Sequence, residues 1–260
     1  MTDEIKLSIT GPIAEIVLNQ PERRNALNTL MWRAIPELVS EAISHPEVRA
    51  LIIHGGRSGV FAAGADISEF DTAYADERRI LESGGLIASA LNALEQCPMP
   101  VIAAIDGPCF GAGVSLAVAA DIRIAHKSAQ FCVPPAKLGL VFPAGDTRRL
   151  VGLIGQGAAK YLMLTAKIIK AQEAKQISLV QEVCDKSAVL VARQMAESMA
   201  KLSPRSLSAI KLMTAGVVSG WPDDAPEADA LFVAGFLGAD HAEGRAAFLE
   251  KRKPQFSNLN

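Results

Sequence analysis

Two stretches of small residues have the composition of turns whose backbone amides face a ligand. They are residues 60–67 (Val-Phe-Ala-Ala-Gly-Ala-Asp-Ile) and residues 106–115 (Asp-Gly-Pro-Cys-Phe-Gly-Ala-Gly-Val-Ser). Small residues permit close backbone approach, and their N–H groups can donate to an anionic oxygen. The second turn follows a predicted strand and opens a predicted helix, whose first amides have no partner within the helix. Two such turns can form an oxyanion hole, although tight packing of strands against helices explains the same residues.

Other kinds of site find less support in the sequence. Neither turn is a G-x-G-x-x-G motif followed by an acidic ribose partner, and there is no phosphate-binding GxxxxGK[ST] motif. The four cysteines show no CxxC spacing, so we expect neither a zinc site nor a disulfide framework. The four histidines show no ligand spacing either. We therefore expect no metal, and reduced, buried thiols.

Composition narrows the class of protein further. The chain has 260 residues, of which 26 are Lys or Arg and 28 are Asp or Glu, so its formal net charge is −2. That balance argues against a dedicated nucleic-acid binder, and a 50% hydrophobic content argues against disorder. We find no targeting segment and no apolar run of membrane-spanning length. The expectation is a cytoplasmic protein with one large domain, or one domain with a smaller appendage.

The elements that would position the turns alternate between strands and helices. A hairpin signal at Gly11-Pro12 separates two apolar segments, and short apolar runs further on predict buried strands. The predicted strands are 5–9, 13–18, 48–53, 101–105 and 122–125, and the predicted helices before residue 148 are 29–43, 77–95 and 111–120. From residue 148 the pattern is almost wholly helical: 148–154, 158–164, 171–176, 188–201, 203–217, 225–236 and 241–251. This order predicts an α/β fold with right-handed crossovers and a helical C-terminal module.

Several motifs together resemble the crotonase (enoyl-CoA hydratase/isomerase) superfamily. They are Pro21 to Asn28 (PERRNALN), Phe61 to Ile67 (FAAGADI), Gly111 to Ala117 (GAGVSLA) with Asp121, Leu164 to Val180, and the tail Glu243 to Arg252 (EGRAAFLEKR). The match is collinear and covers essentially the whole chain. Each motif is modest, but their order and spacing are highly specific.

The resemblance implies a spiral of ββα units, here residues 1–200, and a C-terminal helical trimerisation region, residues 201–260. Trimers of this family often pair into hexamers. The substrate would be a coenzyme A thioester, with no permanently bound cofactor. Its carbonyl would accept hydrogen bonds from the amides of Ala65 and Ala112. The residues implied to line the coenzyme A channel are Arg24, Ala26, Leu27, Ala63, Asp66 and Ile67, with Phe248 and Lys251 approaching the nucleotide end, from the same or a neighbouring subunit.

The sequence departs from the family pattern at the acid/base residues. Hydratases of this family carry two glutamates around one water, and the corresponding positions here are Ser115 and Pro135. Serine is a poor base without a partner, and proline has no side-chain donor or acceptor. Asp146 lies on the loop that faces the acyl end in the family, so it is a candidate acid/base. Alternatively, Asp146 is a helix N-cap with Arg149 as its charge partner.

The leading hypothesis is therefore an acyl-CoA-processing enzyme that stabilises a thioester enolate. The residues fit double-bond isomerisation through Asp146, or decarboxylation, better than hydration; Ser115 is a further candidate for contact with substrate or water. The alternative is a non-catalytic acyl-CoA-binding or assembly protein. RNA binding, known for an odd member of the family, is opposed by the acidic net charge and the absence of a basic helix.

Overall fold

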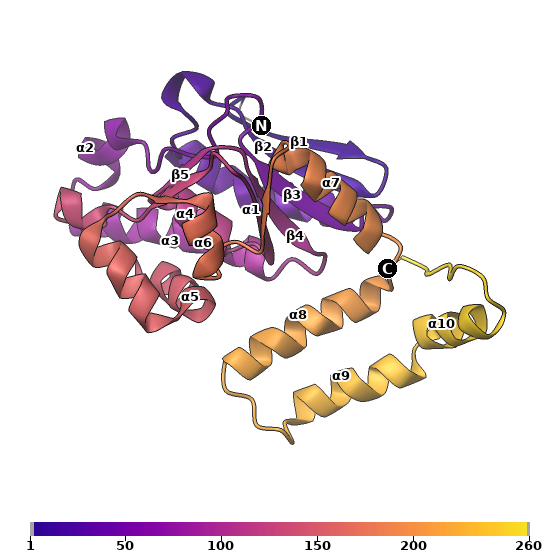
Figure 1. Ribbon diagram of the computed structural model, residues 1–260. Helices are drawn as coiled ribbons and strands as arrows, with labels where there is room; N and C mark the ends of the chain where they lie inside the picture. Colours follow the sequence, from indigo (N-terminus) through magenta and orange to yellow (C-terminus); the bar gives the residue numbers. More distant parts are fainter. Residues whose placement is uncertain (1–2, 259–260) are drawn as a thin grey trace.

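The computed structural model describes residues 3–258 and contains a six-stranded mixed sheet at its centre (Figure 1). The strands run in the order β1-β2-β3-β4-β6-β9. The β1–β2 pair is antiparallel, and every other neighbouring pair is parallel. Their bounds are β1 (Ile5–Thr10), β2 (Ile13–Leu18), β3 (Ala50–His54), β4 (Val101–Ile105), β6 (Ile122–His126) and β9 (Glu182–Cys184). The predicted hairpin and the three predicted buried strands are confirmed.

A second, smaller sheet lies beside the first. Its strands, of two or three residues each, are β5 (Pro108–Phe110), β7 (Gln130–Cys132) and β8 (Ile169–Lys170). β5 pairs with β7 in parallel, and β7 pairs with β8 antiparallel. These strands and β9 were not predicted. The expectation of an almost wholly helical chain after residue 148 is therefore wrong at β8 and β9.

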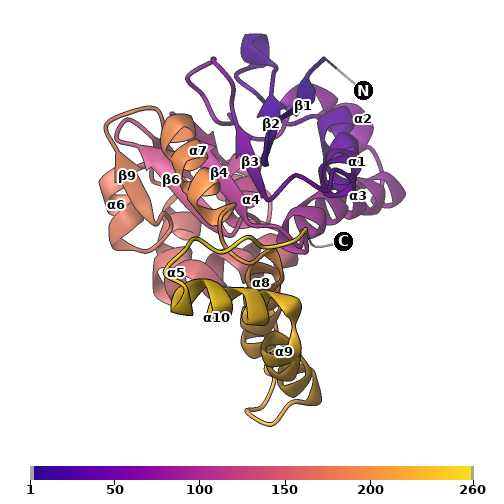
Figure 2. The same cartoon turned by 90° about the vertical axis from the view of Figure 1, so that its right-hand side faces the viewer.

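Helices pack on both faces of the main sheet (Figures 1 and 2). α7 packs against β3, β4 and β6 on one face, whereas α1 packs against α3 on the opposite side of the hairpin and sheet. Most predicted helices are confirmed within a few residues, and the one over 77–95 matches to the residue. The helices are α1 (Thr29–Ser44), α2 (Phe70–Ala73), α3 (Glu77–Glu95), α4 (Ala112–Val118), α5 (Ala144–Thr165), α6 (Ala171–Gln176), α7 (Ala188–Met199), α8 (Pro204–Val218), α9 (Pro226–Leu237) and α10 (Ala239–Leu249).

One helix prediction is confirmed and another needs correction. The predicted helices 148–154 and 158–164 lie on either side of a kink at Gly155, where φ is +72°, within the element α5, which begins earlier than predicted, at Ala144. The small-residue helix predicted over 111–120 is shorter, Ala112–Val118, because the chain turns at Ala119 and Ala120 before entering β6. Within residues 3–258, no helix combines the length and apolar character needed to cross a bilayer.

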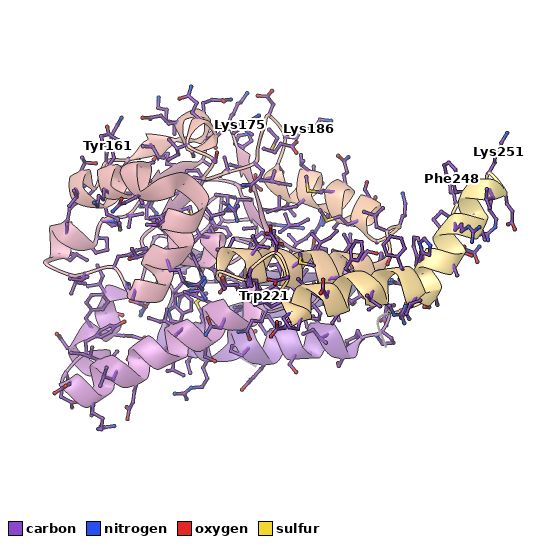
Figure 3. All side chains as sticks on the ribbon, turned by 90° about the horizontal axis from the view of Figure 1, so that it is seen from below. Tyr161, Lys175, Lys186, Trp221, Phe248 and Lys251 are labelled. Atoms are coloured by element: carbon purple, nitrogen blue, oxygen red, sulfur yellow. The ribbon has the colours of Figure 1, made fainter. Side chains whose placement is uncertain are left out.

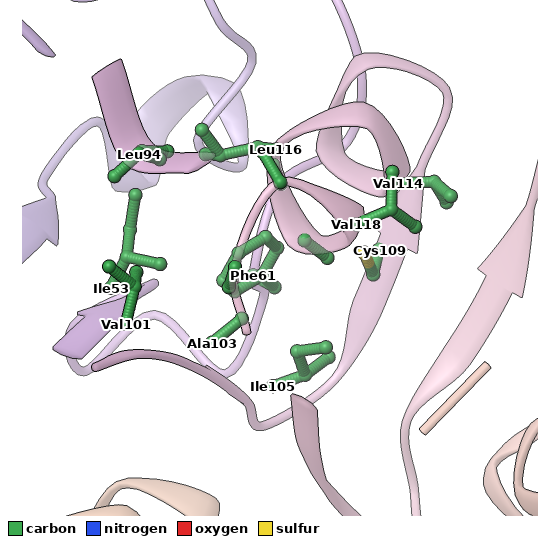
Figure 4. Close-up of a cluster of buried hydrophobic side chains, with 14 of the residues drawn as sticks. Ile53, Phe61, Leu94, Val101, Ala103, Ile105, Cys109, Val114, Leu116 and Val118 are labelled. Atoms are coloured by element: carbon green, nitrogen blue, oxygen red, sulfur yellow. The ribbon is translucent and has the colours of Figure 1, made fainter. Parts of the chain in front are cut away.

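The main core lies between the sheet and the helices on the face opposite α7, among them α1, α3 and α4. Figure 4 shows its centre, where Phe61 is surrounded by aliphatic side chains of β4 and α4. Phe61 and Val114 are fully buried, so both small-residue turns are anchored in this core. In contrast, α8, α9 and α10 extend away from the sheet-containing part (Figures 1 and 2). The boundary between residues 200 and 201 stays a prediction.

Candidate active site

The two small-residue turns lie side by side. The Pro108 carbonyl oxygen accepts from the amides of Phe61 (3.0 Å) and Ala62 (3.2 Å), and the Phe110 amide donates to the Ala62 carbonyl (3.0 Å). At Gly113 a Cβ atom would stand only 2.9 Å from the Cβ and the carbonyl oxygen of Ala62. Glycine at 113 is therefore what allows α4 to begin against the first turn.

The predicted amide donors, Ala65 and Ala112, each follow a glycine with positive φ. φ is +123° at Gly64 and +49° at Gly111, and residues other than glycine rarely adopt these backbone angles. A Cβ placed on Gly111 would be 3.9 Å from the Cα of Gly64, so the two turns meet just before the two alanines. Among the described residues, neither alanine amide donates to a backbone carbonyl. Both N–H groups are thus available to an acceptor brought into the site.

The segment that precedes α1 joins the first turn through backbone hydrogen bonds. The Leu27 amide donates to Gly64 (2.8 Å), the Asp66 amide donates to Leu27 (2.9 Å), and the Ala63 amide donates to Arg24 (3.0 Å). The structure thus brings together the segments carrying the residues expected to line the coenzyme A channel. Of the six, Ile67 is an exposed apolar side chain, and the Asp66 carboxylate is engaged by Arg23 (2.5 Å).

Asn25 is a site-supporting residue that the sequence reasoning missed. It is fully buried at a φ of +54°, and its amide group donates to the carbonyl oxygens of Gly55 and Val60, both at 2.9 Å. These hydrogen bonds hold the segment 20–28 against the loop 55–60, which leads into the first turn. Asparagine tolerates this left-handed conformation better than most residues. That preference is the local signal by which Asn25 could have been found.

Phe248 and Lys251 do not join this cluster within one chain. Phe248 lies on α10, Lys251 follows that helix, and both stand at the far end of the C-terminal helices (Figure 3). Phe248 is 83% exposed. Of the two possibilities that the resemblance left open, an approach from a neighbouring subunit therefore stays a prediction.

Asp146 and Ser115 are both deeply buried at the junction of α4 and α5, with exposed fractions of 4% and 1%. Burial raises the pKa of the Asp146 carboxyl above its usual range, although the neighbouring Ser115 hydroxyl and the charge of Arg149 act in the opposite direction. The structure therefore brings the two candidate side chains of the acid/base region together, from positions 31 residues apart in the chain.

The interpretation of Asp146 as a helix N-cap is wrong. α5 begins at Ala144, its N-cap residue is Pro143, and Asp146 is the third residue of the helix. Arg149 acts on Asp146 as a nearby charge but forms no ion pair with it, because its guanidinium binds the carboxylate of Glu95 at 2.6 Å and the side-chain oxygen of Asn92 at 2.6 Å. None of the ion pairs formed within residues 3–258 includes Asp146. The carboxyl is thus held in the interior without a direct ion pair.

Pro135 opens a short 3-10 turn, Pro135–Leu138, that leads into the loop before α5. Neither this turn nor the loop up to Pro143 carries an acidic side chain. Within residues 3–258 no cluster of three or more His, Cys, Asp or Glu side chains could hold a metal ion. In this part of the structure the buried acidic side chain is therefore Asp146.

Comparisons with known proteins agree with this architecture. The family model described as enoyl-CoA hydratase/isomerase matches residues 8–259. Crotonyl-CoA hydratase from Syntrophomonas wolfei subsp. wolfei is 37% identical, over 98% of both chains. Short-chain-enoyl-CoA hydratase from Clostridium acetobutylicum is 35% identical, over 96% of both. The crystal structure of a putative enoyl-CoA hydratase/isomerase family protein from Hyphomonas neptunium is 52% identical and superposes with a TM-score of 0.95, covering 98% of this chain and 97% of that one.

Proposed function

Because this chain belongs to the enoyl-CoA hydratase/isomerase family, whose members process acyl-CoA thioesters, we propose that it isomerises the double bond of an enoyl-CoA with Asp146 as its single acid/base. The observation that carries the proposal is the buried Asp146 carboxyl, which forms no direct ion pair among the described residues and lies beside Ser115. Such a group is a stronger base than an ordinary aspartate once it has lost its proton.

The proposed role of the Ala65 and Ala112 amides is to hold the thioester oxygen. Their availability and the adjacency of the two turns support this role. Removing a proton from the carbon next to the thioester creates an enolate, whose negative charge collects on that oxygen. Fixed amide donors stabilise such a charge, and each is typically worth about 2.7–4 kcal/mol.

In this reaction Asp146 would transfer a proton from C2 to C4 of the same substrate molecule. The Asp146 carboxylate takes a proton from C2 of a 3-enoyl-CoA, and the electron pair of that C–H bond moves into the thioester carbonyl to give a dienolate. The same carboxyl then returns the proton to C4, which leaves the double bond between C2 and C3. The reaction neither gains nor loses an atom, so one acid/base group is sufficient.

Hydration makes a different demand, because water must be activated by a base while a proton is delivered to C2. Relatives of this chain bear hydratase names, but Ser115 and Pro135 stand where this family's hydratases carry their two glutamates. Neither side chain transfers a proton efficiently. We therefore expect hydration to be slow compared with isomerisation.

The test compares the two reactions in the same preparation. Wild-type protein is expected to convert 3-hexenoyl-CoA to 2-hexenoyl-CoA much faster than it hydrates crotonyl-CoA. Asp146→Asn keeps the size of the side chain and should lower isomerisation about 10²–10⁴-fold. Lys160→Gln, a change at an exposed position of α5, is the matched control and should retain full activity. Robust crotonyl-CoA hydration that persists in Asp146→Ala would overturn the proposal.

Two other outcomes have defined meanings. Conversion of malonyl-CoA or methylmalonyl-CoA without isomerisation would identify a decarboxylase, because loss of CO₂ leaves the same enolate for the amides to stabilise. Calorimetric binding of acyl-CoA without conversion across a panel of thioesters would identify a binding protein without catalytic activity. Either result would replace the isomerase proposal.

We also propose that the chain assembles into a homotrimer, or a hexamer built from two trimers. The support is the apolar surface of α8 and α9, which a soluble monomer rarely exposes. Its exposed members include Ile210, Leu212, Val217, Val218, Phe232, Val233, Phe236 and Leu237. In such an assembly Phe248 and Lys251 would contact the coenzyme A of a neighbouring subunit. Light scattering coupled to gel filtration tests the assembly, and a monomeric mass would contradict it.

A further inference from the structure

The Arg149 guanidinium lies near the Asp146 carboxyl but is held by other residues. Asp146 and Arg149 are three residues apart on α5, a spacing that places two side chains on the same face of a helix. Both residues are buried, with exposed fractions of 4% and 6%. Burial raises the pKa of the Asp146 carboxyl, and the charge of Arg149 acts against this effect. The two side chains are therefore neighbours that influence each other without forming an ion pair.

The end of α3 binds the guanidinium of Arg149. Its Nε and Nη2 atoms donate to Oε2 of Glu95, at 3.1 and 2.6 Å, and Nη2 also donates to Oδ1 of Asn92 at 2.6 Å. Both acceptors lie in the last turn of α3. Hydrogen bonds between two charged groups are shorter and stronger than those between neutral ones. The positive charge of Arg149 is therefore compensated by Glu95 rather than by Asp146.

The third nitrogen of this guanidinium faces the start of α5. A Cβ atom placed on Gly145, the residue before Asp146, would stand 3.3 Å from Nη1 of Arg149. The arginine side chain thus runs back along its own helix to the turn that carries Asp146, the direction that side chains in helices favour. Residues three apart on a helix can form an ion pair through their side chains alone. What keeps Arg149 from Asp146 is therefore its attachment to Glu95 and Asn92.

The other charged groups around Asp146 are exposed to water. α5 packs against α4, which carries no charged side chain, and against the 3-10 turn that precedes α5, which carries the exposed Lys137. Arg148 on α5 is also exposed, and it lies 3.0 Å from Glu95. Charges surrounded by water are screened and act weakly. Arg149 is therefore the cation whose position matters most for the charge state of Asp146.

We propose that Glu95 is a positioning residue for the acid/base of the reaction: by binding Arg149, it keeps the guanidinium from pairing with Asp146. The inference rests on the proposed function, because Glu95 has this role only if Asp146 takes the proton. A carboxylate paired with a guanidinium is a weaker base than one without an ion pair. Glu95 thus acts on the reaction from a different helix, through Arg149 rather than through contact with the substrate.

The test is the pH profile of kcat/KM for the isomerisation of 3-hexenoyl-CoA by the full-length protein. Glu95→Gln preserves the size of the side chain but leaves the charge of Arg149 uncompensated. The acidic limb, which follows the pKa of Asp146, should move to lower pH by about 0.5 pH units or more, and the rate above it should fall. Glu95→Asp keeps the charge and should leave the limb close to that of the wild type.

Two further variants sharpen the result. Arg148→Gln is the matched control, since it removes the exposed partner of Glu95 and should leave the limb within about 0.2 pH units of the wild type. Adding Arg149→Gln to Glu95→Gln removes the cation itself, so the limb should return to the wild-type position or lie above it. A limb that Glu95→Gln leaves in place or moves to higher pH would overturn the inference, as would an equal downward shift in the double variant.

A measurement without substrate separates this inference from the proposed function. In the Glu95→Gln background the Asp146 carboxylate gains Arg149 as its partner, so Asp146→Asn should lower the melting temperature at pH 8, whereas in the wild-type background it should not. Equal effects of Asp146→Asn in the two backgrounds would overturn the inference and leave the proposed function intact. Absence of isomerisation by the wild-type protein would instead overturn the proposed function, and the role of Glu95 in the reaction with it.

Discussion

Two of the regions that bury a carboxylate in this molecule treat it in opposite ways. In the seam between the main sheet and α7, Glu15 of β2 is 9% exposed and receives two hydrogen bonds from Arg193, at 2.5 and 2.8 Å. At the junction of α4 and α5, Asp146 is more deeply buried and has no ion-pair partner among the described residues. The free-energy cost of burying a charge is therefore compensated by Arg193 at Glu15, whereas no ion pair compensates it at Asp146.

The pKa values of the two groups record this difference. Burial alone would raise the pKa of Glu15, but the hydrogen bonds and charge of Arg193, with the nearby His54, outweigh it and lower the pKa to about 2. For Asp146, burial dominates and the pKa is raised. A lowered pKa marks a carboxylate that stabilises the fold, whereas a raised one marks a group whose ionised form is held at a cost. Groups of the second kind concentrate at functional sites.

The largest effect on stability should come from the seam. Glu15→Gln preserves the shape of the side chain but removes its charge, and is expected to lower the free energy of unfolding at pH 7 by about 1–3 kcal/mol. Denaturant titration measures this value. Because the folded-state pKa is lowered, the stabilisation by Glu15 is complete above its unfolded pKa of about 4.3 and is lost as the pH falls towards 2.

The difference between wild type and Glu15→Gln should accordingly shrink as the solution is acidified. Asp185→Asn serves as the control, since it removes a carboxylate whose ion pair with Lys127 is exposed on both sides, and it should have little effect. Equal effects of the two substitutions would contradict the assignment of Glu15 as a stabilising charge.

A smaller change of opposite sign is expected at the site. Asp146→Asn removes a charge that burial disfavours, so the melting temperature at pH 8 should be equal to or higher than that of the wild type. Because the folded-state pKa of Asp146 is raised, the wild type loses stability as the pH rises from the unfolded pKa, about 3.9, through the folded one. The advantage of the variant should therefore disappear towards pH 4. Marked destabilisation at pH 8 would mean that the charge supports the fold.

The smallest expected effect concerns Ser115. The neighbouring Ser115 hydroxyl lowers the pKa of Asp146 against the effect of burial, so Ser115→Ala should raise that pKa further. In the pH profile of kcat/KM, the acidic limb should move to higher pH, while the rate well above it changes by less than about tenfold. An acidic limb that stays in place would show that Ser115 does not act on Asp146.

The sequence predicted the elements whose signals are local. α3 was placed to the residue because Asp76 caps its start and proline follows its end at Pro98. The buried run Val101–Ile105 was equally distinct. The strands β5, β7, β8 and β9 escaped because two or three residues show no period, and their pairing partners lie tens of residues away.

In the candidate site, too, the features with a local sequence signal were predicted, and those set by contacts between distant residues were not. Both small-residue turns were recognisable from composition, and the resemblance aligned Ser115 and Pro135 with the family's acid/base positions. The ion pair of Arg149 with Glu95 was not predicted because Glu95 lies 54 residues earlier on α3, where no sequence pattern links the two. The cap was misjudged because Phe142-Pro143 starts α5 without a polar N-cap, so the nearest aspartate was taken for one.

Because Gly113 contacts Ala62 directly, two functions of the proposed active site, binding the thioester carbonyl and transferring the proton, rest on different parts of the structure. The spacing of the proposed carbonyl-binding amides is fixed by backbone meeting backbone, where no exchange of side chains is tolerated. Ser115 and Asp146 project from neighbouring helices and leave that contact untouched. Natural variation or enzyme engineering can thus replace the residues that transfer the proton without moving the two amides proposed to activate the thioester. A campaign to alter the reaction should vary 115, 135 and 146 and leave 62 and 113 alone.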